Sequence, residues 1–184
     1  MNKKLRILGY ACLALVAVVI VGGAIVSTMV KKPASASETS IAAKGGLVNM
    51  HESDIKPATD KVNVYIFWGK GCPHCSALGN YLAAHVKDYE KFAKIYSFEV
   101  WEDRENKEFF KSFAEHLKVD ANGVPFTIFA DAEPVPGFGT DKDGERLVAS
   151  IKAIYDKTFG APEKVPAADP YAAYSAAKAT AGQK

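Results

Sequence analysis

Two cysteines, Cys72 and Cys75, are separated by two residues in the segment YIFWGKGCPHCSAL, which runs from Tyr65 to Leu78. Two thiols at this spacing can close a disulfide with each other and exchange it with the thiols of another molecule. A disulfide that serves only stability gains more from a long loop than from a two-residue one. The spacing therefore favours redox chemistry over a structural cross-link.

Pro73 suits the first position of a helix, where its missing N–H costs nothing, and this places Cys72 at the N-cap. The unpaired N–H groups and the helix dipole stabilise a thiolate there, and His74 adds to the effect if it is protonated or donates a hydrogen bond. Cysteines in such settings have pKa values of about 3.5 to 7.5, against about 8.5 for a free thiol. Cys75, one turn further on, is expected to be more buried and to resolve the mixed disulfide.

The stabilised thiolate also predicts the direction of the redox reaction. If the pKa of Cys72 is roughly 5, its reduced form at pH 7 is favoured by about 2.7 kcal/mol over that of an ordinary thiol. That free energy raises the reduction potential by about 60 mV in a two-electron couple. We therefore expect an oxidant, with no cofactor other than the redox-active pair of cysteines.

Two alternatives stay open at this point, a metal carrier and a non-catalytic binding module. A zinc site needs four ligands, and the histidines at positions 51, 74, 85 and 116 form no second paired motif beside the cysteines. Copper fits better than zinc, because two thiolates and one imidazole would suffice. We assign no metal ligand.

The cysteine segment follows an apolar run and opens an amphipathic one, and similar patterns alternate along the chain. Strands are expected at 61–68, 95–101, 125–130 and 135–140, and helices from the cysteines to His85, at 106–117 and at 147–155. The order β-α-β-α-β-β-α predicts an α/β domain whose mixed sheet carries helices on both faces.

Taken together, these features resemble the thioredoxin superfamily over about Lys61 to Phe159, and the CPHC tetrad is similar to that of DsbA-type oxidases. The resemblance rests on the strand that ends at Trp68, the cysteines that open a helix, and Gly123-Val124-Pro125 before the strand PFTIFA. It implies a thioredoxin fold with a four- to five-stranded sheet and a cis-proline at Pro125. It also implies that the backbone of Val124 pairs with substrate. Trp68 is expected to pack beside the cysteine loop and restrict access to it, and a purely core role is the alternative.

Two departures from the family are visible. The position six residues before Cys72 usually carries a buried acid that moves protons for the second cysteine, and here it is Ile66. Fast turnover as a reductase is therefore not expected. Glu99, Asp103 and Lys70 are candidates to replace the acid, although each is more typical of a surface charge. The interval from Cys72 to Pro125 is also too short for the helical insertion of DsbA-type proteins, so the scaffold resembles a plain thioredoxin.

The 184-residue chain divides into four predicted segments: 1–30, a membrane anchor or signal segment; 31–47, a flexible linker; 48–160, the thioredoxin-like domain; and 161–184, a disordered Ala/Pro-rich tail. The uncharged run from Ile7 to Val30 rises about 1.5 Å per residue as a helix, enough to cross a bilayer core of roughly 30 Å. Cys12 lies inside this run and is interpreted as a small apolar residue rather than a lipidation site.

Charge places the domain and narrows its partners. Three basic residues precede the apolar run and two follow it, which favours a cytoplasmic N-terminus and a domain outside the cytoplasm. Ala34-Ser35-Ala36 resembles a signal-peptidase site, and cleavage near Ala36 would give a secreted protein. The net charge of +2 indicates no nucleic-acid partner. The expected partners are exported protein thiols or disulfides and an unidentified redox partner.

Overall fold

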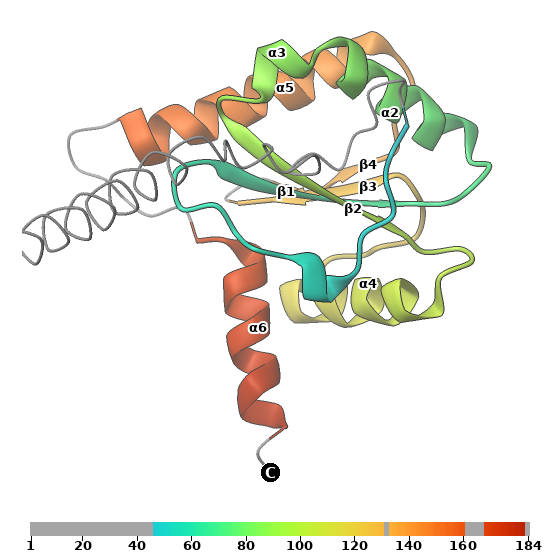
Figure 1. The fold of residues 1–184 in the computed structure, drawn as a ribbon, viewed down its shortest axis with the longest axis vertical. Coiled ribbons are helices and arrows are strands. Elements are labelled where there is room, and N and C mark those ends of the chain that lie inside the picture. The colour runs from blue at the N-terminus through green and yellow to red at the C-terminus, as the bar shows by residue number, and fades with distance from the viewer. Residues whose placement is uncertain (1–45, 131–132, 161–167, 183–184) are drawn as a thin grey trace, which may run out of the picture. The chain divides into compact units, whose positions relative to one another are not determined.

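The structure is a computed structural model that describes residues 46–130, 133–160 and 168–182 (Figure 1). The predicted membrane anchor and almost all of the predicted linker fall on residues 1–45, outside the described part of the chain. Within the described ranges, no helix combines the length and the apolar composition that crossing a bilayer requires.

A four-stranded mixed sheet forms the centre of the domain, with the strand order β2-β1-β3-β4. β1 runs parallel to β2 and antiparallel to β3, and β4 is antiparallel to β3. The strands are β1 (Val62–Trp68), β2 (Ala93–Glu99), β3 (Phe126–Phe129) and β4 (Val135–Pro136). β4 is shorter than the predicted strand because Gly137, with a φ of 77°, turns the chain out of the extended conformation.

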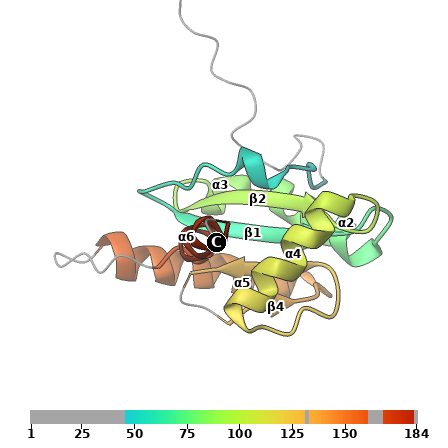
Figure 2. The ribbon, with the colours of Figure 1, turned by 90° about the horizontal axis from the view of Figure 1, so that it is seen from below.

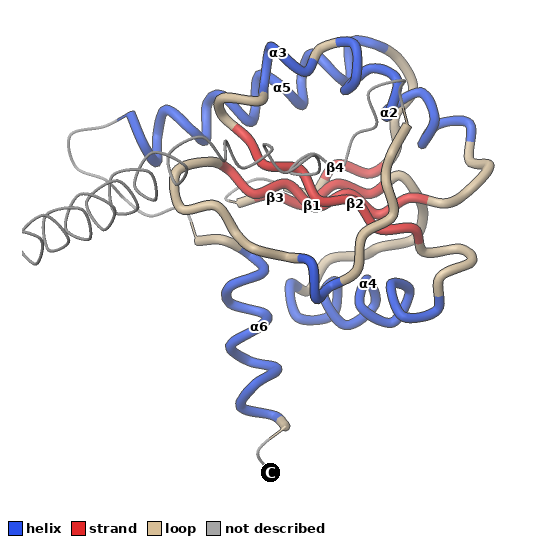
Figure 3. The backbone as a smooth tube through the Cα atoms, in the orientation of Figure 1, coloured by secondary structure: helices blue, strands red, loops and turns tan. Residues whose placement is uncertain are grey.

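Helices cover both faces of the sheet, as the alternation of patterns predicted. α2, α3 and α5 lie on one face, and α4 lies on the other (Figures 1 and 3). The helices are α2 (Pro73–Ala84), α3 (Val86–Tyr89), α4 (Arg104–Leu117), α5 (Asp141–Tyr155) and α6 (Pro170–Ala181), with the short turns η1 (Glu52–Asp54) and η2 (Asp156–Gly160). The domain therefore has a thioredoxin-like α/β fold.

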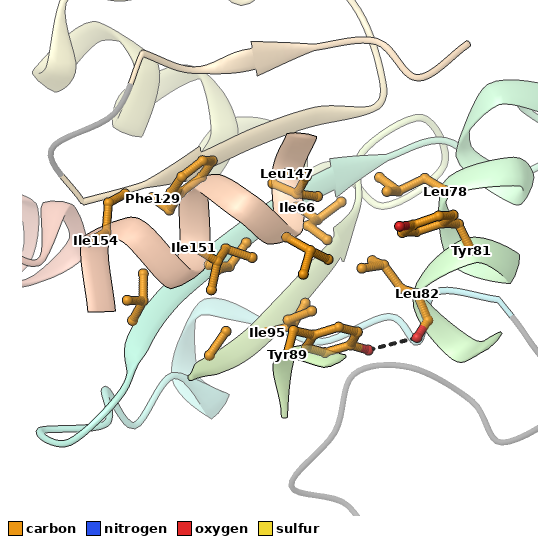
Figure 4. Packing of buried hydrophobic residues seen from close by; sticks show 14 of the residues in the cluster. Ile66, Leu78, Tyr81, Leu82, Tyr89, Ile95, Phe129, Leu147, Ile151 and Ile154 are labelled. Carbon is orange, nitrogen blue, oxygen red and sulfur yellow. Dashed lines mark hydrogen bonds between the residues drawn. The ribbon is translucent and has the colours of Figure 1, made fainter. Parts of the chain in front are cut away.

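Successive side chains of β1 enter different cores, which explains why its sequence is continuously apolar from Val64 to Trp68. Val64 and Ile66 pack with α2 and α5 in an aliphatic cluster (Figure 4). Tyr65 and Phe67 pack on the other face in an aromatic cluster. All four side chains are fully buried, so β1 forms the centre of the domain and fixes where the chain enters the cysteine segment.

The aromatic cluster is built mainly by α4. The rings of Phe67 and Phe110 stack with centroids 4.3 Å apart, and Phe109 and Phe113 stack with each other at 5.5 Å. Offset aromatic pairs at such distances contribute about 0.5–1.5 kcal/mol beyond their buried area. The phenylalanines at 109, 110 and 113 are all buried in this core.

The expectation of a disordered tail is wrong for residues 170–181, which form α6 (Figure 2). Asp169 accepts a hydrogen bond from the N–H of Tyr171 at 3.0 Å, and Pro170 occupies the first turn, so the helix has a regular start. Tyr171 and Tyr174 lie one turn apart and contact Phe109 and Phe113 of α4. The alanines between them favour a helix, which can then bury both tyrosines at once.

Candidate active site

Cys72 is the N-cap of α2, and Pro73 is its first helical residue, as predicted. The sulfur of Cys72 accepts a hydrogen bond from the N–H of Cys75 at 3.2 Å. The two cysteines form a disulfide, with their Cα atoms 5.2 Å apart. The bonded sulfur of Cys72 therefore faces the positive end of a helix, where a thiolate would be stabilised once the bond opens.

A tight turn delivers the chain from β1 to this helix. The N–H of Cys72 donates to the carbonyl of Gly69 at 3.1 Å, and Gly71 adopts a φ of 82°, which favours glycine. Both cysteines are buried, with 4% of Cys72 and 2% of Cys75 exposed, so the predicted contrast in burial between them is small. Gly71 and Pro73 are exposed on either side of Cys72, so the nucleophile lies just beneath the surface.

The segment that leads into β3 lies close to Cys72. The peptide bond between Val124 and Pro125 is cis, as the resemblance implied. The carbonyl oxygen of Val124 is 3.8 Å from the sulfur of Cys72. Pro125 is anchored in turn, because its carbonyl accepts the N–H of Gly137 at 2.7 Å. The two segments that the sequence assigned to the site are thus brought together, although they are far apart along the chain.

His74 contacts the segment before α5 through its ring, and its predicted effect on the Cys72 thiolate stays a prediction. Its Nδ1 lies 2.8 Å from the carbonyl oxygen of Phe138, and since a carbonyl can only accept, Nδ1 carries the proton. The imidazole thus ties the first turn of α2 to the segment before α5 and does not hydrogen-bond to Cys72 through this nitrogen.

Trp68 ends β1, one residue before the turn, and is partly buried. Within the described residues, its indole Nε1 is buried without a hydrogen-bond partner. Its cross-strand neighbour is Glu99 at the end of β2. Trp68 therefore stands at the base of the cysteine loop, and a role in restricting access to the cysteines stays a prediction.

Ile66 occupies the buried position where the family usually has an acid, and it lies in the aliphatic cluster with Leu78 of α2 and Leu147 of α5 (Figure 4). It has no exposed surface. The face of α2 that follows Cys75 therefore packs on hydrocarbon at this position. Ile66 fills the place in the core where the family usually has a carboxylate.

Glu99 contradicts the expectation of a surface charge, because only 5% of it is exposed. One carboxylate oxygen accepts the N–H groups of Lys70 at 3.1 Å and Trp101 at 2.9 Å. The other accepts those of Glu102 at 2.9 Å and Asp103 at 2.8 Å. Glu99 thereby joins the turn before Cys72 to the loop before α4.

Those hydrogen bonds also decide the charge of Glu99. Burial acts to raise its pKa, but the four backbone donors together hold the pKa below its ordinary value of 4.5. The group is therefore an anion near neutral pH, and each oxygen is already occupied by two donors. The signal for this arrangement was a lone glutamate inside the apolar strand sequence IYSFEVW.

The other two candidate replacements for the family acid have structural roles. Asp103 caps α4 by accepting the N–H of Asn106 at 3.1 Å, and this hydrogen bond is the main cause of its lowered pKa. Lys70 is exposed, and its ammonium group lies 2.8 Å from Glu102. Lys70 is thus a surface charge, as predicted.

Metal ligands are not gathered around the cysteines in the part of the chain that the structure describes. No group of three or more His, Cys, Asp or Glu side chains there has an arrangement that could hold a metal ion. His85 contacts Asp88 at 3.0 Å, and His51 lies 3.6 Å from Asp103. Among the described residues, the geometry offers the cysteine pair for disulfide chemistry and no metal centre beside it.

Comparison with known proteins returns structural neighbours only. No protein-family model and no curated protein matches the chain. A thioredoxin-like protein from Clostridium perfringens is 19% identical and covers 67% of this chain and 91% of its own, with a TM-score of 0.42. Thioredoxin f from spinach chloroplast is 18% identical and covers 60% and 97%, also with a TM-score of 0.42. Chloroplastic thioredoxin z is 18% identical and covers 57% and 93%, again at 0.42. We base the thioredoxin-like fold on the strand order and the helix positions described above.

Proposed function

We propose that this protein is a thiol-disulfide oxidoreductase that oxidises exported polypeptides through Cys72 and Cys75. One observation carries the proposal: a disulfide whose first sulfur caps α2 and lies 3.8 Å from the carbonyl of Val124, just before β3. This arrangement combines a stabilised leaving sulfur with a short stretch of backbone beside which an extended substrate can pair.

The chemistry that the site supports has two exchange steps. A substrate thiolate attacks the sulfur of Cys72, the bond between Cys72 and Cys75 breaks, and Cys75 leaves as a thiolate that takes up a proton. A second substrate thiol loses its proton and attacks the substrate sulfur of the mixed disulfide, so that Cys72 leaves as a thiolate. The substrate loses two electrons and gains a disulfide, and a partner protein that carries a disulfide must reoxidise the pair.

Two features favour the oxidising direction. The N-terminus of α2 stabilises the thiolate of Cys72, which is the product of the second step. Ile66 supplies no carboxylate beneath α2 that could take a proton from Cys75. A reductase needs that proton transfer, because Cys75 must become a thiolate before it can attack the mixed disulfide between Cys72 and the substrate. The substrates are proposed to be exported because residues 1–30 carry the features of an anchor with a cytoplasmic N-terminus.

The acidity of Cys72 tests the proposal directly. In the full-length chain, Cys12 is replaced by serine so that one thiol titrates at a time, and Cys75→Ala leaves Cys72 alone. Thiolate absorbance against pH should give Cys72 a pKa within about 3.5 to 7.5. The matched variant Cys72→Ala reports Cys75, which should titrate higher. A pKa for Cys72 near that of a free thiol, about 8.5, would remove the basis for the activity.

Direction and location are tested separately. The reduction potential of the pair, measured against glutathione, should lie well above the value of about −270 mV typical of thioredoxin. A lower potential would reverse the proposed direction while leaving the disulfide chemistry intact. In cells, Cys75→Ala should trap mixed disulfides on exported polypeptides, whereas trapped cytoplasmic proteins would place the domain on the other side of the membrane.

A further inference from the structure

A groove of about 540 Å³ runs along α4, and Val124 is one of the residues that line it. Its floor contains Val100, Phe110 and Ala114, which are nearly fully buried. One wall is the segment from Val119 to Val124, and Trp101 stands at the other. Val124 connects the groove to the chemistry, because its carbonyl lies 3.8 Å from the sulfur of Cys72.

Trp101 is the more unusual feature of this groove. Among the described residues, it and Val48 are the large hydrophobic side chains that stand exposed, with 57% of Trp101 accessible to solvent. Its indole packs against Gly69 and fills the space that a Cβ atom at that glycine would occupy. The backbone N–H of Trp101 donates to the buried carboxylate of Glu99 at 2.9 Å. Trp101 is thus held in place and exposed, a combination typical of residues that bind a partner.

Gly69 connects Trp101 to Cys72. The indole of Trp101 packs against Gly69, and the carbonyl of the same glycine accepts the N–H of Cys72 at 3.1 Å. Trp101 and Val124 also line the same groove. A polypeptide that presents a sulfur to Cys72 and pairs with Val124 therefore brings the side chains near its cysteine into contact with Trp101.

We infer that Trp101 is a specificity-determining residue and that the groove receives an extended segment of the substrate polypeptide with a bulky apolar side chain close to its reactive cysteine. The inference rests on the proposed function and adds the class of substrate. Continuity with Cys72 selects the substrate as occupant. The rim adds no preference for one sign of charge, because Lys107 and Lys111 stand beside Glu108, Glu115 and Asp120.

Two dithiol peptides test the inference with the full-length chain. They differ only in the two residues that flank the reactive cysteine. These residues are leucine and phenylalanine in the apolar peptide and two serines in the polar peptide. The wild-type protein should oxidise the apolar peptide with a kcat/KM about tenfold to a hundredfold higher than the polar one, mainly through KM. In Trp101→Ser this preference ratio should fall to near one, and Trp101→Phe should keep most of it.

Val48→Ser is the matched control, because it removes the other exposed hydrophobic side chain, which does not line the groove, and it should keep the wild-type ratio. A ratio that is unchanged in Trp101→Ser, or a wild-type protein without preference, would overturn the inference. A loss for both peptides by the same factor would also overturn it, because Trp101 would then act only by holding the turn at Gly69.

Binding can also be measured without disulfide exchange. For this, the apolar peptide carries serine in place of both cysteines and a fluorescent label, and its anisotropy reports binding. Wild type should bind this peptide more tightly than Trp101→Ser does. Binding without oxidation of the parent peptide would retain the groove and reject the proposed enzyme. If both dithiol peptides were oxidised but wild type and Trp101→Ser bound the serine peptide equally well, the proposed enzyme would be retained and the role of the groove rejected.

Discussion

Two carboxylates stand at opposite ends of β1 and differ in their donors: Glu99 accepts four backbone N–H groups, whereas Asp169 accepts two side-chain donors and the backbone N–H of Tyr171. The donors of Glu99 come from the turn and the loop around its end of β1. Asp169 serves the other end, where it accepts the hydroxyl of Tyr65 at 2.8 Å and the amide of Asn63 at 3.0 Å. Backbone donors fix the path of a loop, whereas side-chain donors attach one element to another.

The difference in donors gives the two ends different tasks. At the Glu99 end, the loop conformations carry Lys70 toward Cys72 and Trp101 onto Gly69, so the carboxylate shapes the candidate site. At the Asp169 end, the carboxylate fastens α6 to the sheet. Burial raises the pKa of Tyr65 and the charge of Asp169 raises it further, so the phenol stays protonated and keeps donating. We therefore expect Glu99 to matter for chemistry and Asp169 for stability alone.

The largest effect is expected from Glu99→Gln. The amide NH2 of the glutamine would face two backbone N–H groups that donate to a carboxylate oxygen in the wild type. Those donors would lose their acceptor, and each unsatisfied buried donor costs about 1–3 kcal/mol. The free energy of unfolding should fall by about 2 to 4 kcal/mol in urea titrations. The rate of disulfide exchange should fall about tenfold or more as the turn before Cys72 shifts.

Glu102→Gln is the matched control for that variant, because it removes an exposed carboxylate from the same loop, one that pairs with Lys70 at the surface. Its unfolding free energy should stay within about 0.5 kcal/mol of wild type. If Glu102→Gln lost as much stability or activity as Glu99→Gln, charge in the loop, and not the occupied buried carboxylate, would be the cause.

A smaller effect is expected from Asp169→Asn. One carboxylate oxygen becomes an amide that faces the donor of Asn63, while the other can still accept from Tyr65. Unfolding should cost about 1 to 2 kcal/mol less than in wild type. Disulfide exchange should change by less than about twofold, because α6 packs on the aromatic face and does not contribute to the groove beside Cys72. Asp60→Asn, at an exposed aspartate before β1, is the control. A large loss of exchange in Asp169→Asn would break the proposed contrast.

The parts of this picture that could be predicted are those written in local patterns. The phenylalanines of α4 recur at helical spacing, and β1 is apolar on both faces, so the order of the elements follows from periodicity. Proline after a cysteine marks the start of α2, and the GVP motif placed the cis bond at Pro125 through the family resemblance. Each of these signals lies within a few residues of the feature that it predicts.

The features that could not be predicted depend on partners far along the chain. The Ala-rich segment of α6 becomes ordered because Tyr171 and Tyr174 find the surface of α4, which the segment's own composition does not reveal. The partners of Glu99 are backbone N–H groups, and no side-chain pattern records where a loop directs them. His74 meets a carbonyl at position 138 for the same reason. Contacts to backbone across loops carry no sequence signature.

The smallest expected effect is a change in unfolding free energy at acid pH that depends on the titration of Glu99. Its pKa in the folded protein lies below the ordinary value of 4.5, so its contribution to stability is present above that pH and is lost as the pH falls through the folded pKa. The gap in unfolding free energy between wild type and Glu99→Gln should therefore narrow as the pH is lowered below about 4.5.

Other acids do not obscure this comparison. The pKa values of Asp103 and Asp143 are also lowered, the latter to about 2, but both groups are present in both proteins and cancel in the difference. Urea titrations of wild type, Glu99→Gln and Glu102→Gln at several pH values measure the gap. Glu102→Gln should run parallel to wild type. Parallel curves for wild type and Glu99→Gln would mean that the carboxylate's charge is not what holds the loop, and the contrast with Asp169 would then reduce to packing at the two ends of β1.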